Sequence, residues 1–539
     1  MAERDMEESM RQGKWAATLV KARRGSAAWM SMLAFTTTAG LAVAGPASAG
    51  YRPEHGSPCS PATNASSGTL GGTAGVSGLL CGQVGNGGFR GDKVTGAEGD
   101  DRGRGRGDHV NYSVPCSAQA LIEAIKKANS SPGADILHLA RRCTYKLTAP
   151  DAGNAPNGLP IITSDITIEG RDATITRDSS APAFRILFVD STGTLTLNKI
   201  TISGGRATTL DCPLFPGEGT CGGGILNNGK MTVNRSRVIN NISTSDIFAQ
   251  GGGIDNSGTA AVCDTEVSGN TAEYTGPGTP FAVTGGGIVN DGPLTVDRSR
   301  VHHNTVRATA DTGSLAEAPG IAAFANTLIK NTVISHNQAS APGGTARGAL
   351  VNNAAPPATM TVIDTVIRDN TASAPGGLAT GGGTTTNRTM TLTRTRIIDN
   401  HATAPDGGTV HGGGLTLGPT GQVTLISSAV HGNTASAPGG GTALGGGAAN
   451  PSGGTLTIEQ SHISKNTATA PGGGTARGGG VFTDVGLTTL KRSTVIGNSA
   501  GDGGGIFETS GTVTLDNTVV KRNTPNNCAP PNSVPGCTG

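Results

Sequence analysis

Short runs of alternating hydrophobic and polar residues recur along the chain from about residue 195 to residue 523. In one run, Leu294 and Val296 alternate with Thr295 and Asp297, which is the period of a strand with one buried face. The same alternation occurs at Met231/Val233, Met360/Val362, Met390/Leu392, Val423/Leu425, Leu456/Ile458 and Val513/Leu515. Because such strands are too short to be stable alone, we expect each to pair in parallel with its equivalent in the next unit, about 4.8 Å away.

Three columns of residues align these units. An asparagine recurs, mostly 29 to 34 residues apart, at Asn241, Asn270, Asn304, Asn337, Asn370, Asn400, Asn433, Asn466, Asn498 and Asn523. Five positions before each asparagine stands Ser or Thr, at Ser236, Thr265, Ser299, Thr332, Thr365, Thr395, Ser428, Ser461, Ser493 and Thr518. Three positions before each asparagine stands Val or Ile. These columns predict an all-β fold of stacked parallel sheets, a parallel β-helix (β-solenoid), over residues 151–525.

Glycine blocks such as Gly285 to Ile288 are expected to supply a tight bend and another strand, because glycine permits positive φ and close backbone approach. We expect the asparagine to accept a similar left-handed bend and to hydrogen-bond to the asparagines above and below it. A coil of three short strands needs roughly 20 to 25 residues. A spacing near 33 therefore predicts loops of about ten residues along one side of the stack, at 371–380, 401–410, 434–443 and 467–476.

Before the repeats, the segment 117–129 has the pattern of an amphipathic helix. Ser117 can cap its start, and Leu121, Ile122 and Ile125 fall on one face. Strand-like runs follow at 136–139 and 143–147. We interpret residues 111–150 as an N-terminal cap that covers the open end of the array.

The N-terminal segment resembles an export signal. A basic cluster at Lys21, Arg23 and Arg24 precedes a mainly apolar run over 27–44 and small residues at 47–49, which predicts a signal peptide over 1–49 with cleavage after Ala49. The alternatives are a twin-arginine export route, which Gly25 and Ser26 fit poorly, and a membrane anchor, which the polar residues within the apolar run disfavour. Without a second apolar run of membrane-spanning length, we expect a soluble, secreted mature chain with no membrane span.

Residues 50–110 are rich in Gly and Ser and are interpreted as a flexible leader, in which the arginines near residue 104 are solvated. The net charge of +2, from 40 basic and 38 acidic residues, gives no global field that would attract nucleic acid. Only 3% of residues are aromatic, which agrees with a narrow interior of Val, Ile and Ala.

Export would place the nine cysteines in an oxidising compartment, where pairing is expected. Sequence neighbours suggest the pairs Cys59 with Cys81, Cys116 with Cys143, Cys212 with Cys221, and Cys528 with Cys537. The last pair would close a C-terminal tail over 526–539. Cys263 is then odd, and is either a free or intermolecular thiol or an inert buried one.

The repeated pattern GGGI-x-N-x-G with LTV-x-x-S-x-V-x-x-N resembles right-handed parallel β-helix repeat proteins of the pectate-lyase superfamily. It is similar in particular to the secreted repeats of chlamydial polymorphic outer membrane proteins. The segment from Cys116 to Thr148 looks like the N-terminal cap of bacterial secreted members. The resemblance is specific for fold and weak for activity, because the superfamily includes lyases, hydrolases and adhesins.

Candidate chemistry is sparse. A lyase of this family would show acidic residues on neighbouring coils that hold Ca²⁺, with Arg or Lys as base. The weak candidates are Asp255, Asp264, Asp297, Arg235 and Arg298, and their convergence in one groove would favour an enzyme. These charged residues are spread along the array in equivalent repeat positions, which favours a solvated, charged face over one convergent site.

Histidine and aromatic side chains are two further residue types that could bind a ligand. The histidines at 302, 303, 336, 401, 431 and 462 are assigned to different columns, so they are expected to be surface residues that form no metal site. The aromatic residues Phe248, Tyr274, Phe281 and Phe324 fall within about three coils, and we expect buried loop anchors rather than a sugar-binding patch.

We therefore expect no cofactor and an extracellular structural or adhesive role towards cell wall, glycan or protein. The alternatives are a carbohydrate-active enzyme of the pectate-lyase type acting on an acidic polysaccharide, and a solenoid that assembles through Cys263. The oligomeric state and the catalytic residues stay open.

Overall fold

The structure is a computed structural model that describes residue 81 and residues 110–153, 156–208, 212, 219–276, 282–309 and 313–539. The described residues belong to one compact unit, Gly78–Gly539. The predicted signal peptide, most of the predicted leader, Cys59 and Phe281 lie outside them.

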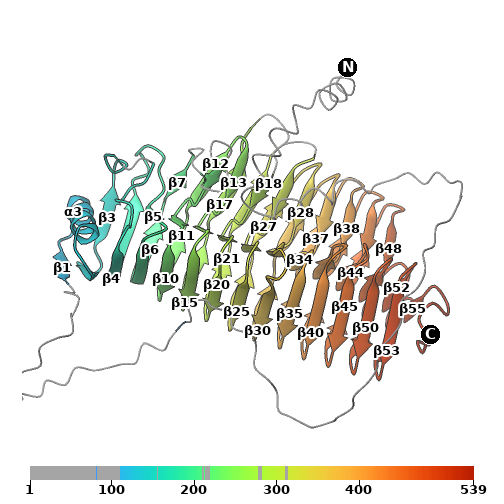
Figure 1. The fold of residues 1–539 in the computed structure, drawn as a ribbon. Coiled ribbons are helices and arrows are strands. Elements are labelled where there is room, and N and C mark those ends of the chain that lie inside the picture. The colour runs from blue at the N-terminus through green and yellow to red at the C-terminus, as the bar shows by residue number, and fades with distance from the viewer. Residues whose placement is uncertain are drawn as a thin grey trace, which may run out of the picture. The chain divides into compact units, whose positions relative to one another are not determined.

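This unit is a parallel β-solenoid, as predicted (Figure 1). One coil passes through β19 (Ile288–Asn290), β20 (Leu294–Asp297), β21 (Arg300–His302), β22 (Thr305–Ala308) and β23 (Leu315–Glu317), and the next begins with β24 (Ile321–Ala323). The first strand belongs to sheet C, β20 and β21 to sheet A, β22 to sheet D and β23 to sheet E. Equivalent residues stack in register, so that Val296 lies opposite Val262 on one side and Ile329 on the other.

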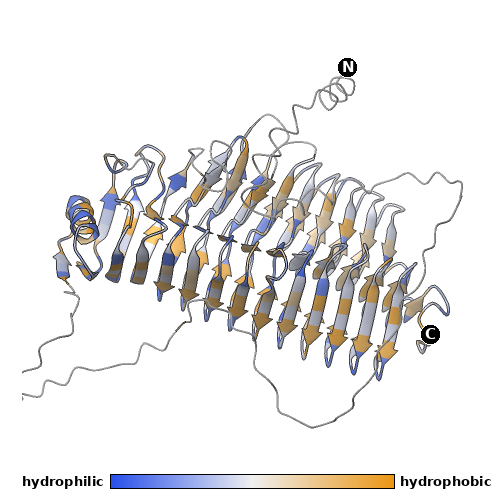
Figure 2. Ribbon diagram, viewed as in Figure 1, coloured by the Kyte–Doolittle hydropathy of each residue, from blue (hydrophilic) through white to orange (hydrophobic). Residues whose placement is uncertain are grey.

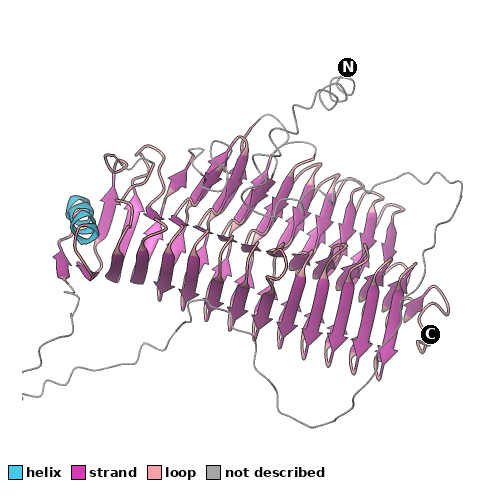
Figure 3. Cartoon of the chain, viewed as in Figure 1, coloured by secondary structure: helices cyan, strands magenta, loops and turns pink. Residues whose placement is uncertain are grey.

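The predicted cap closes one end of the stack (Figure 3). It comprises β1 (Asn111–Val114), α3 (Ala118–Asn129), β2 (Ala134–Leu139) and β3 (Thr144–Leu147). The helix begins after Ser117, whose hydroxyl accepts a hydrogen bond from the Ala120 N–H at 3.4 Å. Leu121 and Ile125 are buried, as predicted, whereas Ile122 is half-buried. Among the described residues no helix is both long enough and apolar enough to cross a membrane.

Sheets A and C enclose the larger interior, which we call the large core. Its side chains are mainly Ile, Leu, Val and Met, for example Ile288, Val296, Val301 and Ile321, all 0% exposed. Figure 2 shows hydrophobic residues along these strands and hydrophilic residues in the turns at their outer ends.

The predicted ten-residue loops are wrong, because each contains two more strands. Residues 371–380 form β32 (Thr371–Ser373) of sheet D and β33 (Leu378–Thr380) of sheet E, with a short turn between them. Alternate small residues such as Ala372 and Ala379 are fully buried in a second interior. We call sheets D and E with their joining turns the alanine arm. The coil therefore has five strands rather than three.

A seam of glycine and asparagine separates the two interiors. A Cβ on Gly286 would lie 2.5 Å from the carbonyl oxygen of Thr305, and one on Gly287 would lie 2.6 Å from that of Gly320. No side chain fits there, so the glycine block is required where the chain returns past itself. Beside it, the side-chain Nδ2 of Asn304 donates to Oδ1 of Asn337 at 3.0 Å, and the backbone N–H of Asn304 donates to the same oxygen at 3.0 Å.

This asparagine ladder confirms the predicted stacking but not the predicted bend. The left-handed residue is the one before each asparagine, for example His303 with φ 54° or Asp369 with φ 54°. The asparagine side chain instead points inward to the ladder and is fully buried, as at Asn304. Its neighbour makes the turn because that side chain can point to solvent.

Four disulfides are present in the described residues. The predicted pairs Cys116–Cys143, Cys212–Cys221 and Cys528–Cys537 are confirmed. The fourth joins Cys81 to Cys263, 182 residues apart in sequence. The predicted pair Cys59–Cys81 is therefore wrong, and Cys263 is neither a free or intermolecular thiol nor an inert buried one. Pairing of sequence neighbours cannot reveal a contact between residues so far apart along the chain. Four disulfides indicate an oxidising compartment.

The C-terminal segment, predicted as a tail, contains one more strand of the solenoid. Residues Cys528–Ala529 form β55, which pairs with β52 (Ile506–Glu508) and adds the last strand to sheet C.

Candidate functional site

Three of the predicted site residues occupy one position on successive coils. Arg235, Asp264 and Arg298 are each the left-handed residue at the bend between the two sheet A strands, with φ 48°, 49° and 47°. Arg235 lies between β10 (Lys230–Asn234) and β11 (Arg237–Ile239), and Asp264 follows β15 (Thr259–Cys263). The bend directs side chains of this column outward.

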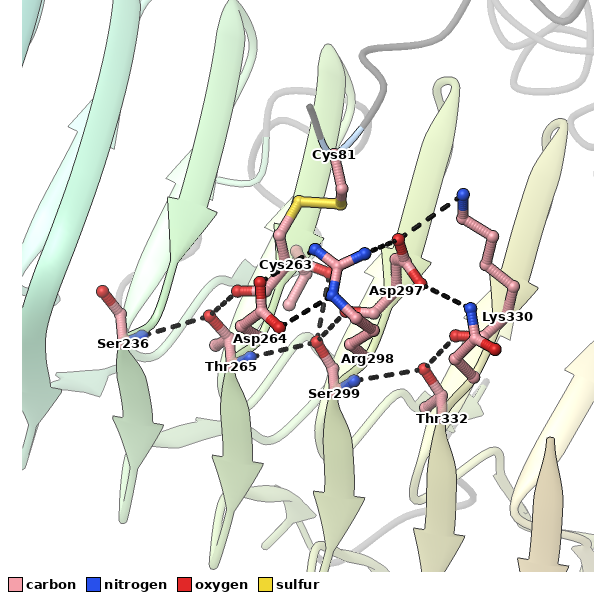
Figure 4. Close-up of polar contacts among 12 residues, drawn as sticks. Cys81, Ser236, Cys263, Asp264, Thr265, Asp297, Arg298, Ser299, Lys330 and Thr332 are labelled. Atoms are coloured by element: carbon pink, nitrogen blue, oxygen red, sulfur yellow. Dashed lines mark hydrogen bonds and ion pairs between the residues drawn. A yellow bond between two sulfur atoms is a disulfide. The ribbon is translucent and has the colours of Figure 1, made fainter. Parts of the chain in front are cut away.

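The serine and threonine column fixes this bend (Figure 4). The N–H of Thr265 donates to the hydroxyl of Ser299 at 3.1 Å, and the N–H of Ser236 donates to that of Thr265 at 3.2 Å. The hydroxyl of Ser299 in turn donates to the carbonyl of Asp297 at 2.8 Å. The regular spacing seen in the sequence thus reflects a buried hydrogen-bond ladder along the bend of sheet A.

Arg298 lies between two carboxylates (Figure 4). Its Nε and Nη2 donate to the two oxygens of Asp264 at 2.8 and 2.9 Å, and its Nη1 donates to Asp297 Oδ2 at 2.5 Å. The hydrogen bond with Arg298 is the main cause that lowers the pKa of Asp264. The same bond raises the pKa of Arg298. Both groups are therefore held in their charged forms.

Asp297 is fully buried and has two further partners. Its Oδ1 accepts from Asn331 Nδ2 at 3.0 Å, and Lys330 Nζ lies 3.4 Å from its Oδ2. Asp297 is thus surrounded by donors and forms an internal anchor for Arg298.

The fifth candidate lies elsewhere. Asp255 is in β14 (Ile254–Asn256) of sheet C and is buried. The predicted convergence is therefore partial: Asp264 and Asp297 meet at Arg298, with Arg235 beside them, and Asp255 takes no part.

Around this cluster lies a groove of about 530 Å³, which we call the arginine groove. Its lining includes Arg235, Arg237, Asp264, Glu266, Arg298 and Arg300. The acidic coil stands between two basic coils. Arg298 pairs with Asp264, and Arg237 Nε pairs with Glu266 at 2.8 Å. Burial raises the pKa of Glu266, but its hydrogen bonds to Arg237 and Ser268 outweigh this effect and lower it.

Two guanidinium groups of the groove stay available. Arg235 and Arg300 are exposed, and neither forms an ion pair with another residue that the structure describes. With both carboxylates already paired, the four arginines and two acids leave a net charge of two positive in the lining. The arrangement can therefore bind an anion, since guanidinium groups match carboxylate and phosphate oxygens.

The Asp–Arg pair is repeated elsewhere together with one flanking arginine, whereas the arginine on the other side of the aspartate is not. Asp364 and Arg394 form the same two-bonded pair, at 2.6 and 2.8 Å, on later coils. The coil before Asp364 carries Asn331 and Val333 in place of two arginines. Arg396 follows Arg394 as Arg300 follows Arg298, so it is the combination of Arg235 and Arg300 on both sides of an acidic coil that distinguishes the groove.

Glu266 was missed in the sequence. Stacking the segments Asn234–Val238, Cys263–Val267 and Asp297–Val301 puts R-x-R, D-x-E and R-x-R in register, which is the signal that would have found it.

The histidine prediction was partly wrong, because His303 and His336 occupy the same column. Their rings stack with centroids 4.9 Å apart. Of the aromatic candidates, Phe248 and Tyr274 are buried, which confirms their role as anchors, and Phe324 packs in part against a small cluster around Val289. In the described part of the chain, no three or more His, Cys, Asp or Glu side chains are arranged to hold a metal ion.

Comparison with family models, with curated proteins and with solved structures gave no match. The geometry of the groove is thus the basis for a functional proposal.

Proposed function

We propose that the chain is a secreted right-handed β-helix protein of the pectate-lyase-like kind, with an adhesive role at the cell exterior. Its partner would be an acidic glycan, such as a cell-wall polysaccharide with carboxylate groups. The observation that supports this proposal is the arginine groove, in which Arg235 and Arg300 are exposed and lack a described ion-pair partner.

The spacing of these two arginines suits a polymer. They stand on coils separated by two strand spacings of about 4.8 Å each. Each guanidinium can donate two parallel hydrogen bonds to one carboxylate. The acidic coil between them has its carboxylates paired to Arg237 and Arg298, which reduces repulsion of an anionic chain.

The alternative is a lyase acting on an acidic polysaccharide, and the convergence of Asp264 and Asp297 at Arg298 favours it. A base must lose a proton, however, and the bond to Asp264 raises the pKa of Arg298. The same carboxylates hold a guanidinium where a lyase of this type would hold Ca²⁺. Binding is the role that these contacts favour.

Binding of the full chain to immobilised polygalacturonate, with neutral dextran as comparison, tests the proposal. We expect Arg235→Ala and Arg300→Ala each to weaken binding about tenfold, because a hydrogen bond to a charged group contributes roughly 1.5–3 kcal/mol. Arg396→Ala is the matched control, since Arg396 is exposed in the same column as Arg300, three coils away. Equal binding to dextran, or no loss in either variant, would contradict it.

A second assay separates the lyase. The full chain is incubated with polygalacturonate and Ca²⁺, and unsaturated products are followed by ultraviolet absorbance. Turnover that Arg298→Lys abolishes would replace the adhesive role with the catalytic one.

A further inference from the structure

Two adjacent histidines on sheet A place their ring nitrogens side by side. His302 ends β21 and His303 makes the left-handed bend that follows, with φ 54°. Their Nδ1 atoms lie 2.8 Å apart. One of these two nitrogens donates a hydrogen bond to the other, and an ion that displaced the shared proton would be within reach of both.

A carboxylate orients the first ring. Glu266 Oε1 lies 3.3 Å from His302 Nε2, and Glu266 is itself held by Arg237 Nε at 2.8 Å and by the Ser268 hydroxyl at 2.8 Å. A carboxylate at Nε2 keeps the proton on that nitrogen and leaves the Nδ1 lone pair facing His303. This is the outer-shell arrangement that orients metal-binding histidines.

The second ring is held by stacking. His303 lies parallel to His336 of the next coil, with an interplanar angle of 6° and centroids 4.9 Å apart. His336 Nε2 in turn lies 3.8 Å from Asp369 Oδ2. Both imidazoles are therefore positioned before any ligand arrives, which lowers the entropy lost on binding.

We propose that Nδ1 of His302 and Nδ1 of His303 chelate a divalent transition-metal ion, with Cu²⁺ or Ni²⁺ favoured over Zn²⁺. An ion about 2.1 Å from each nitrogen would subtend an angle of roughly 85° between them at the observed separation. That angle fits neighbouring positions of square-planar or tetragonal Cu²⁺ and Ni²⁺ and is too small for tetrahedral Zn²⁺. Water would complete the coordination, because the protein offers two ligands here. The inference does not depend on glycan binding.

Titration of the full chain, purified without a histidine tag, with CuCl₂ tests the proposal. We expect one site whose electron paramagnetic resonance spectrum shows two coupled nitrogens. His302→Ser and His303→Asn introduce residues that equivalent positions already carry, at Ser268 or Ser335 and at Asn240, so both variants are expected to fold. Each should lose about 100-fold in Cu²⁺ affinity, since even an outer-shell partner contributes about 10- to 100-fold.

Two comparisons complete the experiment. Glu266→Gln should weaken Cu²⁺ binding about tenfold through the orientation of His302. His431→Ser is the matched control, because His431 occupies the His302 column four coils away and its Nδ1 faces the Ser464 hydroxyl at 2.9 Å. Absence of Cu²⁺ binding by the parent chain, or unchanged affinity in both His302→Ser and His303→Asn, would overturn the proposal.

Discussion

In the coil around residue 400, Ile397 points into the large core and Ala402, five residues later, points into the alanine arm; both are fully buried. Ile397 is in β36 (Arg396–Ile398) and Ala402 in β37 (His401–Thr403). Their partners along the stack are Ile367 and Val430 in the large core, but Ala372 and Ala435 in the arm. The two interiors thus use the same stacking rule with side chains of different size.

One coil is thus stabilised in two ways. Burial of a large aliphatic side chain contributes roughly 1.5–3 kcal/mol, and an alanine methyl contributes less in proportion to its area. The arm therefore depends more on hydrogen bonds between coils and on close approach of its two sheets. The large core should therefore lose stability when a buried side chain is made smaller. The alanine arm should lose stability when a buried side chain is made larger.

A substitution in the asparagine seam, which borders both interiors, should cause the largest loss of stability. Asn400 Oδ1 accepts from the N–H of Asn370 at 3.1 Å and from its Nδ2 at 2.9 Å. Asn400→Ala would leave the backbone N–H of Asn370 and one of the two N–H groups on its Nδ2 unsatisfied, at a cost of about 1–3 kcal/mol each. Hydrogen exchange measured along the chain should show both interiors of this coil opening together. Protection lost on one side alone would contradict a shared seam.

A cavity in the large core should come next. Ile397→Ala is expected to lower the free energy of unfolding by about 2–5 kcal/mol. Urea unfolding followed by circular dichroism measures the loss, and exchange should rise mainly in β36 and its neighbours. The exposed neighbour Arg396→Ala, on the same strand, serves as the control with little expected change.

An enlarged side chain in the arm tests the opposite limit. Ala402→Leu should destabilise the fold by about 1–3 kcal/mol, because overpacking a filled interior forces backbone shifts. Ala402→Gly, which removes only a methyl group, is the comparison. A stabilising effect of leucine would show that the arm has unused space and would weaken the distinction between the interiors.

Low pH should destabilise the alanine arm through His411, which ends β38 (Thr409–His411) in the same coil. Burial lowers the pKa of His411 from 6.5 to about 4. Between these values the unfolded chain binds a proton that the folded chain does not, so stability is full above pH 6.5 and falls as the pH decreases towards 4. Melting temperatures at pH 7 and pH 5 measure this smaller effect. His411→Leu, which copies Leu444 one coil later, should reduce the pH dependence.

The large core and the ladders could be predicted from the sequence because their signal is local. Alternation at Leu294 and Val296 identifies a strand, and the recurrence of Asn304 and Ser299 aligns the coils. The alanine arm could not be predicted this way. The segment 371–380 is rich in Ala, Pro and Gly, a composition typical of a turn. Ala372 can be recognised as a core residue only once the equivalent alanines of neighbouring coils are stacked on it.

The arginine groove could be predicted from the sequence only in part. Arg235, Asp264 and Arg298 were found as charged residues in repeat positions, but their pairing depends on which coils are neighbours. Asp255 fits the same composition and lies on another sheet, because its place in the coil differs. The stacking of His303 on His336 is likewise visible only once the coils are aligned. Both residues then fall in the column directly before the asparagine, where their rings meet.

The disulfide between Cys81 and Cys263 closes a covalent ring that contains the cap and the first coils of the solenoid. Tension applied to the chain before Cys81 would pass through the sulfur atoms directly into β15. The covalent path through the residues between the two cysteines would be bypassed until that bond was reduced. An oxidising exterior would therefore set where a mechanical pull enters the stack, namely at β15, on the coil that pairs with β10.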